Sequence, residues 1–238
     1  MDEGPIAAVI CAAGSSSRMG GVKKEFQRME SSHPLTVLGS AVSAFAAVPS
    51  IQTIVIAVNE NREDEARKAL SPEHLSAQKP EVLFVKGGNC RRASVFNALC
   101  ALLPYNPCYV LIHDGARPWV SQSLIEKLIE KVKKHQAVVP LLLITETPKE
   151  CDSSLDERVT REKTVFIKTH LKRANTGAAQ TPQAFKFPEI LRAHEKAAEA
   201  EDEEFTDDAE IWGRFCGPVA VILGSPENRK ITFPEDFG

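Results

Sequence analysis

The sequence of 238 residues has little that would suit a membrane or a nucleic-acid partner. No apolar run approaches the roughly 18–20 residues of a membrane span, and the acidic start MDEGPIAAVICAAG differs from the basic start of a signal peptide. The 29 Lys and Arg against 32 Asp and Glu give a net charge of −3, which provides no general field to hold a polyanion. We therefore expect a cytoplasmic protein with no nucleic-acid or membrane partner.

Cysteine and glycine motifs that would define other classes of protein are also missing. The six cysteines form no C-x-x-C pair and have no nearby histidine at metal-ligand spacing, so we expect no protein-built metal site. Cys11, Cys100 and Cys108 lie in apolar stretches, which indicates reduced cysteines that act as small hydrophobes. Neither the P-loop string nor the dinucleotide string G-x-G-x-x-G is present, which argues against an NAD-dependent dehydrogenase.

What the sequence does contain is an alternation of short apolar runs with amphipathic segments. The runs have the length and β-branched content of buried parallel strands, and the segments carry apolar residues at spacings of three and four. This order predicts an α/β fold, with a mostly parallel sheet and helices on both faces, in a single domain over residues 1–238. The expected strands are Ile6–Ala12, Thr53–Val58, Val82–Val85, Tyr109–Ile112 and Ala137–Leu143, and the expected helices are Leu35–Val48, Arg62–Leu70, Arg91–Leu103 and Gln122–Lys134.

The alternation breaks after Thr145. Residues 146–180 are polar, rich in Thr, Lys and Arg, and lack a sustained helical stripe. Because a structureless loop of that length is improbable in a compact domain, we expect an inserted arm that forms a hairpin or packs on a second subunit. Helical patterns return at Pro188–Ala200 and Asp207–Phe215, and a strand is expected at Val219–Leu223.

Three of the expected strands end in turns of small and charged residues. The first turn, AAGSSSRMGG, is followed by Lys24, and Arg18 and Lys24 would add charge where a polyphosphate needs neutralising. The string KGGNCRRASV follows the third strand and offers groups for a base and a ribose, while HDGARP follows the fourth. Since ligands bind beyond the carboxyl ends of parallel strands, these turns predict a nucleotide site.

Seven motifs then resemble one known family. They are AAG-x-x-x-RMG, V-K-K-E-F, GG-N-x-R-x-x-SV, HDGARP, QTPQAF, FTDDA and N-x-K-I-T-x-PEDF, in this order from about Ile6 to Phe237. The set resembles the 2-C-methyl-D-erythritol 4-phosphate cytidylyltransferases of the non-mevalonate isoprenoid pathway. The resemblance implies a Rossmann-like nucleotidyltransferase domain, homodimeric through a protruding β arm. It also implies CTP and a sugar-alcohol phosphate as substrates, with Mg²⁺ held mainly by the CTP phosphates.

The resemblance assigns roles to individual residues. Arg18 and Lys24 match the pair that stabilises the transition state, and Lys230 matches the lysine that positions the sugar phosphate. The residues that match the nucleotide-binding parts are Ala12, Ala13, Gly14 and Ser15 in the phosphate loop and Gly88, Asn89 and Ser94 around cytosine and ribose. The other matches are Asp114 and Arg117, a strand-end pair beside the reacting groups, and Thr147 and Arg173, arm residues that reach the sugar phosphate of the neighbouring subunit.

The implied reaction is attack by the sugar phosphate on the α-phosphorus of CTP. A phosphate monoester needs no base near pH 7, so we interpret His113 as a hydrogen-bonded structural residue. We expect Thr206 to cap a helix whose first turn holds Asp207 and Asp208. Two alternatives stay open: a cytidylyltransferase for ribitol 5-phosphate or another pentitol phosphate, and a non-catalytic nucleotide-binding regulator of the same fold.

Overall fold

The computed structural model describes residues 4–14, 23–29, 35–75, 80–155, 161–200 and 204–237. Within these ranges, the main sheet has the strand order β10-β5-β9-β4-β1-β2-β3, and β8 also pairs with β5. Its strands are β1 (Ile6–Cys11), β2 (Ile51–Val58), β3 (Glu81–Lys86), β4 (Tyr109–Asp114), β5 (Ala137–Leu143), β8 (Gly177–Ala179), β9 (Gln183–Lys186) and β10 (Ala220–Leu223).

Most neighbouring strands of this sheet are parallel. β1 pairs in parallel with both β2 and β4, β2 with β3, and β5 with β10, which confirms the expected sheet. The exceptions are β9, which runs antiparallel between β4 and β5, and β8, which is antiparallel to β5. Strand β9 is not predicted from the sequence, because its four residues, QAFK, are too few and too polar to stand out as a strand.

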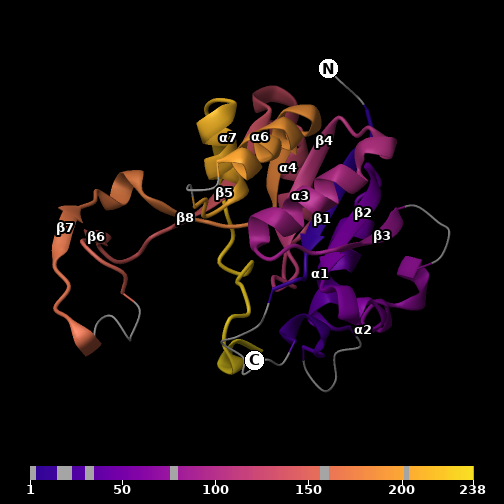
Figure 1. Cartoon of the computed structure of the whole chain (residues 1–238), viewed down its shortest axis with the longest axis horizontal. Coiled ribbons are helices and arrows are strands. Elements are labelled where there is room, and N and C mark those ends of the chain that lie inside the picture. Colours follow the sequence, from indigo (N-terminus) through magenta and orange to yellow (C-terminus); the bar gives the residue numbers. More distant parts are fainter. Residues whose placement is uncertain are drawn as a thin grey trace.

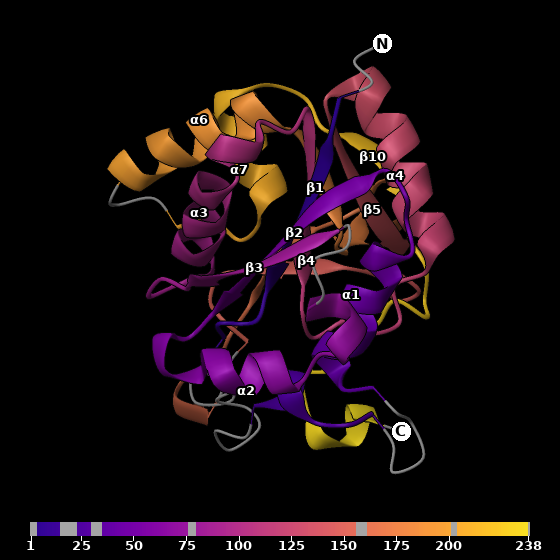
Figure 2. The ribbon, with the colours of Figure 1, turned by 90° about the vertical axis from the view of Figure 1, so that its right-hand side faces the viewer.

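Helices cover both faces of the sheet, as expected (Figure 2). Successive strand residues point to opposite faces, so Ala8 and Ile10 of β1 belong to one core cluster while Ala7 and Val9 belong to the other. The first cluster includes residues of α1 (Val37–Ala46), α2 (Glu63–Lys68) and α4 (Gln122–His135), and the second includes residues of α3 (Arg91–Ala101), α6 (Phe187–Glu199) and α7 (Asp208–Phe215). Every helix expected from the sequence has a counterpart here.

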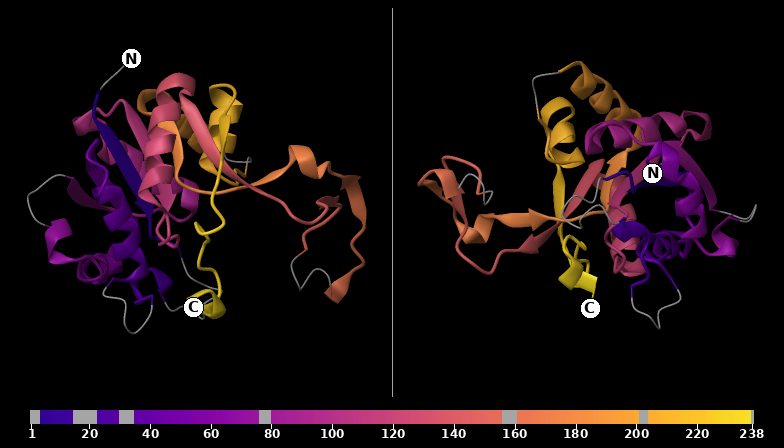
Figure 3. Two further views of the ribbon diagram at one scale, coloured as in Figure 1. Left: turned by 180° about the vertical axis from the view of Figure 1, so that it is seen from behind. Right: turned by 60° about the horizontal axis from the view of Figure 1, so that its bottom comes forward.

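An arm projects from the side of this body. Its strands β6 (Lys149–Cys151) and β7 (Ile167–His170) form a separate antiparallel two-stranded sheet, which lies apart from the main sheet in Figures 1 and 3. The end of the expected arm segment belongs to the body instead: Gln180 is buried and donates from its amide to the carbonyl oxygens of Ser225 and Asn228.

The start of α7 differs from the expectation. Asp207, and not Thr206, is the N-cap, and its carboxylate accepts a hydrogen bond of 2.9 Å from the backbone N–H of Glu210. The Thr206 hydroxyl donates instead to the Glu210 carboxylate. Aspartate and threonine are both good N-caps, and Asp207 is also held by the Gln183 amide at 2.7 Å, a long-range contact that the local sequence does not reveal.

Along the described parts of the chain, no helix combines the length and apolarity needed to cross a membrane.

Candidate functional site

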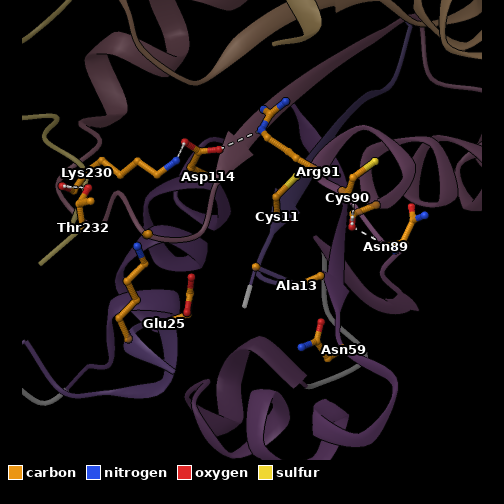
Figure 4. A pocket seen from close by; sticks show the side chains of 15 residues that line it. Cys11, Ala13, Glu25, Asn59, Asn89, Cys90, Arg91, Asp114, Lys230 and Thr232 are labelled. Atoms are coloured by element: carbon orange, nitrogen blue, oxygen red, sulfur yellow. Dashed lines mark hydrogen bonds and ion pairs between the residues drawn. The ribbon is translucent and has the colours of Figure 1, made fainter. Parts of the chain in front are cut away.

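A cavity of about 540 Å³ opens beyond the carboxyl ends of β1 and β4 (Figure 4). It lies where the turns after β1, β3 and β4 meet the segment after β10, as the sequence analysis expected for a ligand site. Eight of the fourteen predicted site residues line it: Ala13, Gly14, Lys24, Gly88, Asn89, Ser94, Asp114 and Lys230.

The other predicted residues lie elsewhere. Ala12 is buried in the core below the cavity, and Arg117 lies behind its wall. Thr147 and Arg173 belong to the arm segment and do not line the cavity. Arg18 and Ser15 lie outside the described residues.

Two adjacent lysines on the N-terminal side have different surroundings. The Lys23 amine donates to the carbonyl oxygen of Gly14 and does not line the cavity. Lys24 does line it, although its side chain is largely buried, and its Nζ donates to the carbonyl oxygen of Ile231 at 2.6 Å. Of these two adjacent lysines, Lys24 is therefore the one that contributes positive charge to the cavity wall.

The loop after β3 is held in a fixed shape. The Ser94 hydroxyl accepts from the N–H of Gly88 at 3.0 Å and donates to the carbonyl oxygen of Cys90 at 2.9 Å. A side chain at position 88 would place its Cβ 2.3 Å from the Cβ of Ala93, so only glycine fits there. Ser94 thus shapes the loop, and Asn89 and the backbone are left to face the cavity.

Asp114, the last residue of β4, is the centre of a charge cluster. Its Oδ2 lies 2.9 Å from Nζ of Lys230 and 3.6 Å from Nε of Arg117, while its Oδ1 lies 3.3 Å from Nε of Arg91. Burial by itself would raise the pKa of Asp114, but the charges of Lys230 and Arg91 outweigh burial and hold the pKa well below its usual range. Asp114 is therefore an anion at neutral pH, and it holds Lys230 at the cavity.

Arg91 and the buried acid behind it were missed by the sequence analysis. Arg91 lines the cavity, and its Nη2 lies 2.8 Å from Oδ2 of the fully buried Asp208. Both residues lie in motifs that the sequence already showed: Arg91 in GG-N-x-R and Asp208 in FTDDA. Their pairing joins the start of α3 to the start of α7, which no local pattern reveals. The remaining unpredicted lining residues are Cys11, Glu25, Asn59, Cys90, Ala116 and Thr232.

Two other titratable groups near the site are not poised for catalysis. His113 is fully buried between the Thr181 hydroxyl and the carbonyl oxygen of Arg117, and burial lowers its pKa to about 4, so it is a neutral, hydrogen-bonded structural residue as predicted. Burial raises the pKa of the Cys11 thiol to about 12, which leaves no thiolate for nucleophilic attack. Within the described residues, no group of three or more His, Cys, Asp or Glu could hold a metal ion by itself.

Lys24, Arg91 and Lys230 thus bring three positive charges to a cavity at the carboxyl edge of a parallel sheet. This arrangement defines an α/β protein with a charged cavity where the ligands of parallel sheets bind. Residues 6–238 match the family described as 2-C-methyl-D-erythritol 4-phosphate cytidylyltransferase, and the chain belongs to this family.

Relatives and solved structures agree with this membership. The bifunctional enzyme IspD/IspF of Bartonella henselae is 36% identical over 98% of this chain and 55% of its own length, and that of Brucella anthropi is 37% identical over 98% and 53%. The chain therefore spans about half the length of these curated relatives. The 4-diphosphocytidyl-2C-methyl-D-erythritol synthase of Anaerococcus prevotii superposes with a TM-score of 0.80 at 28% identity, covering 99% of this chain and 94% of that one.

Proposed function

We propose that this chain transfers a cytidylyl group from CTP to 2-C-methyl-D-erythritol 4-phosphate, giving CDP-methylerythritol and pyrophosphate. The observation that carries the proposal is the convergence of Lys24 and Lys230, from opposite ends of the sequence, on one cavity beside Asp114. Two substrates that both carry phosphate repel each other, and fixed cations between them offset that repulsion. The family match favours methylerythritol phosphate over ribitol phosphate as the acceptor.

The reaction needs positioning and charge more than proton transfer. An oxygen of the sugar phosphate attacks the α-phosphorus of CTP, the new P–O bond forms, and the bond to the β-phosphate oxygen breaks as pyrophosphate leaves. Because the nucleophile is already an anion near pH 7, no base is required, which suits the neutral and enclosed His113. Lys24, Lys230 and Arg18 would stabilise charge on the transferring and leaving oxygens.

The residues present also fit a magnesium ion. Mg²⁺ is commonly held by one or two carboxylates together with substrate phosphates and water. Asp114 supplies an ionised carboxylate on the cavity wall, which would add a ligand to an ion held mainly by the CTP phosphates. When bound, magnesium would neutralise part of the triphosphate charge.

The arm supports a homodimer as part of the proposal. Its segment exposes large apolar side chains, with Ile167 52%, Phe166 65% and Leu155 68% exposed. Such side chains are costly to leave in water and are suited to pack on a second copy. Arg173 and Thr147 lie on this arm and not at the cavity of their own chain, so their role at the sugar phosphate requires the neighbouring subunit. All six cysteines are free, which suits the reducing cytoplasm that we propose as the location.

A pyrophosphate-release assay tests the function. The chain is given CTP and Mg²⁺ with either methylerythritol phosphate or ribitol 5-phosphate, and release is expected with methylerythritol phosphate. Faster pyrophosphate release with ribitol 5-phosphate would show that a pentitol phosphate is the acceptor substrate. Tight CTP binding without release from either acceptor would indicate the non-catalytic regulator.

A further inference from the structure

A chain of ion pairs continues from the cavity into the interior between α3, α6 and α7. Lys230 and Arg91 lie on opposite sides of Asp114, at 2.9 Å and 3.3 Å from its two carboxylate oxygens (Figure 4). The other end of the Arg91 guanidinium lies 2.8 Å from Oδ2 of Asp208. Nε2 of His194, on α6, lies 3.2 Å from Oδ1 of Asp208. One guanidinium therefore bridges two carboxylates, of which one faces the cavity and the other the core.

The innermost groups of this series of ion pairs are the most buried, and Asp114 beside the cavity is 11% exposed. The side chains of Asp208 and His194 have no exposed surface, whereas Arg91 is 31% and Lys230 39% exposed. A buried carboxylate contributes little net stability even when it is paired, and an apolar residue would commonly pack there at lower cost. Asp208 can do one thing that an apolar side chain cannot, which is to draw one end of Arg91 inward.

We propose that Asp208 is a positioning residue for the transfer reaction, a role that rests on the function proposed above. Asp208 fixes the Arg91 guanidinium from the inside, Arg91 fixes one oxygen of Asp114, and the other oxygen of Asp114 holds Lys230 toward the cavity. Without Asp208, the charge of Arg91 would turn to Asp114 and compete with Lys230 for that carboxylate. Lys230 would then lose its fixed place beside the reacting phosphate.

The helix start that carries Asp208 offers a matched control. Asp208→Asn removes the charge and keeps the shape. Asp207→Asn likewise removes a charge at this helix start: it keeps an N-cap oxygen, gives up the hydrogen bond from the Gln183 amide and touches no cavity residue. We expect Asp208→Asn to lower kcat/KM for the sugar phosphate by about tenfold or more while the Kd for CTP changes by less than about threefold, and Asp207→Asn to leave both unchanged. A merely structural Asp208 would lower Tm with no such split between the two substrates, and that result would overturn the proposal.

A second readout does not depend on catalysis. Without CTP or metal, acetic anhydride labels lysines, and mass spectrometry follows the peptide that carries Lys230. Asp208→Asn is expected to speed Lys230 labelling by about threefold or more relative to Asp207→Asn, because the ion pair to Asp114 is loosened. Equal rates would overturn the proposal.

The two proposals can fail separately. If wild-type protein releases no pyrophosphate, the proposed function fails, yet the labelling comparison still decides whether Asp208 holds Lys230 in place. If Asp208→Asn does not fold, Arg91→Lys replaces it in the labelling experiment. A single ammonium keeps the charge and cannot span both carboxylates, so faster Lys230 labelling is again expected and an unchanged rate contradicts the inference.

Discussion

Arg117 donates a hydrogen bond of 2.8 Å from Nη1 to the carbonyl oxygen of Asn228. The neighbouring backbone adds a second link, from the N–H of Ile231 to the carbonyl oxygen of Ala116 at 2.9 Å. These bonds attach the segment after β10 to the turn after β4 on both sides of Lys230. Arg117 therefore holds the backbone segment that carries Lys230, and its own side chain does not line the cavity.

Alanine variants of Lys23 and Lys24 test which of these two adjacent lysines takes part in the reaction. Lys24→Ala removes a cation from the cavity wall, and loss of one preorganised donor commonly lowers turnover by about a hundredfold. Lys23→Ala, which removes the hydrogen bond to Gly14 but no charge from the cavity wall, is expected to cost less than about tenfold. Steady-state pyrophosphate release measures both. The reverse ranking would give the catalytic role to Lys23, and turnover of both variants within about threefold of wild type would remove it from both lysines.

Gly88→Ala is expected to distort the loop after β3. Its Cβ would lie 2.3 Å from the Cβ of Ala93 and 2.9 Å from a backbone atom of that residue, so the loop must shift and CTP affinity should fall by about tenfold or more. Gly213→Ala is the control, because a Cβ there has no atom within 4 Å and alanine favours the helix. Calorimetric titration with CTP measures the difference, and equal affinities would show that the loop does not shape the nucleotide site.

Mixing two inactive variants tests whether the arm acts across subunits. If Arg173 serves the neighbouring site, a dimer of one Lys24→Ala chain and one Arg173→Ala chain has one site with both residues intact. Co-expression should then restore about a quarter of wild-type turnover, since half of the dimers are mixed and each has one working site. Each variant expressed alone provides the baseline. No recovery on mixing would place both residues in one subunit's site.

A charge on the arm should weaken the dimer. Phe166→Glu puts a carboxylate at a side chain that is 65% exposed in the single chain and is expected to be covered by the partner, so the protein should sediment as a monomer. Leu103→Glu is the matched control, because Leu103 is 55% exposed on the body near the end of α3. Analytical ultracentrifugation distinguishes them. An unchanged dimer, or a wild-type monomer, would contradict the proposed interface.

The buried His113 makes stability depend on pH. Burial lowers its folded pKa to about 4, below the ordinary value of 6.5, so between these values the unfolded chain binds a proton that the folded chain does not. This contribution is therefore complete above pH 6.5 and is lost as the pH falls from 6.5 toward 4. For urea unfolding, the loss between pH 7 and pH 5 should be larger by about 2 kcal/mol in wild type than in His113→Gln. Equal losses would show that His113 titrates normally in the folded chain.

The sequence by itself determined the elements and the chemistry of the turns between them. Short apolar runs and amphipathic segments predicted β1 to β5 and the helices between them. The spacing of apolar residues, every second residue in a strand and every third or fourth in a helix, is a local property of the chain. Small and charged residues after three strands located most of the cavity wall, since parallel strands share one carboxyl edge.

Only the tertiary structure decided which distant residues meet. The insertion of β9 between β4 and β5, the pairing of Arg91 with Asp208, and the attachment of Arg117 to Asn228 all join segments that are far apart in sequence. Each depends on how the helices and strands pack, and no periodicity within a segment encodes that packing. The residue types could therefore indicate a phosphate site. Which of its charged side chains pair with one another was decided by the fold.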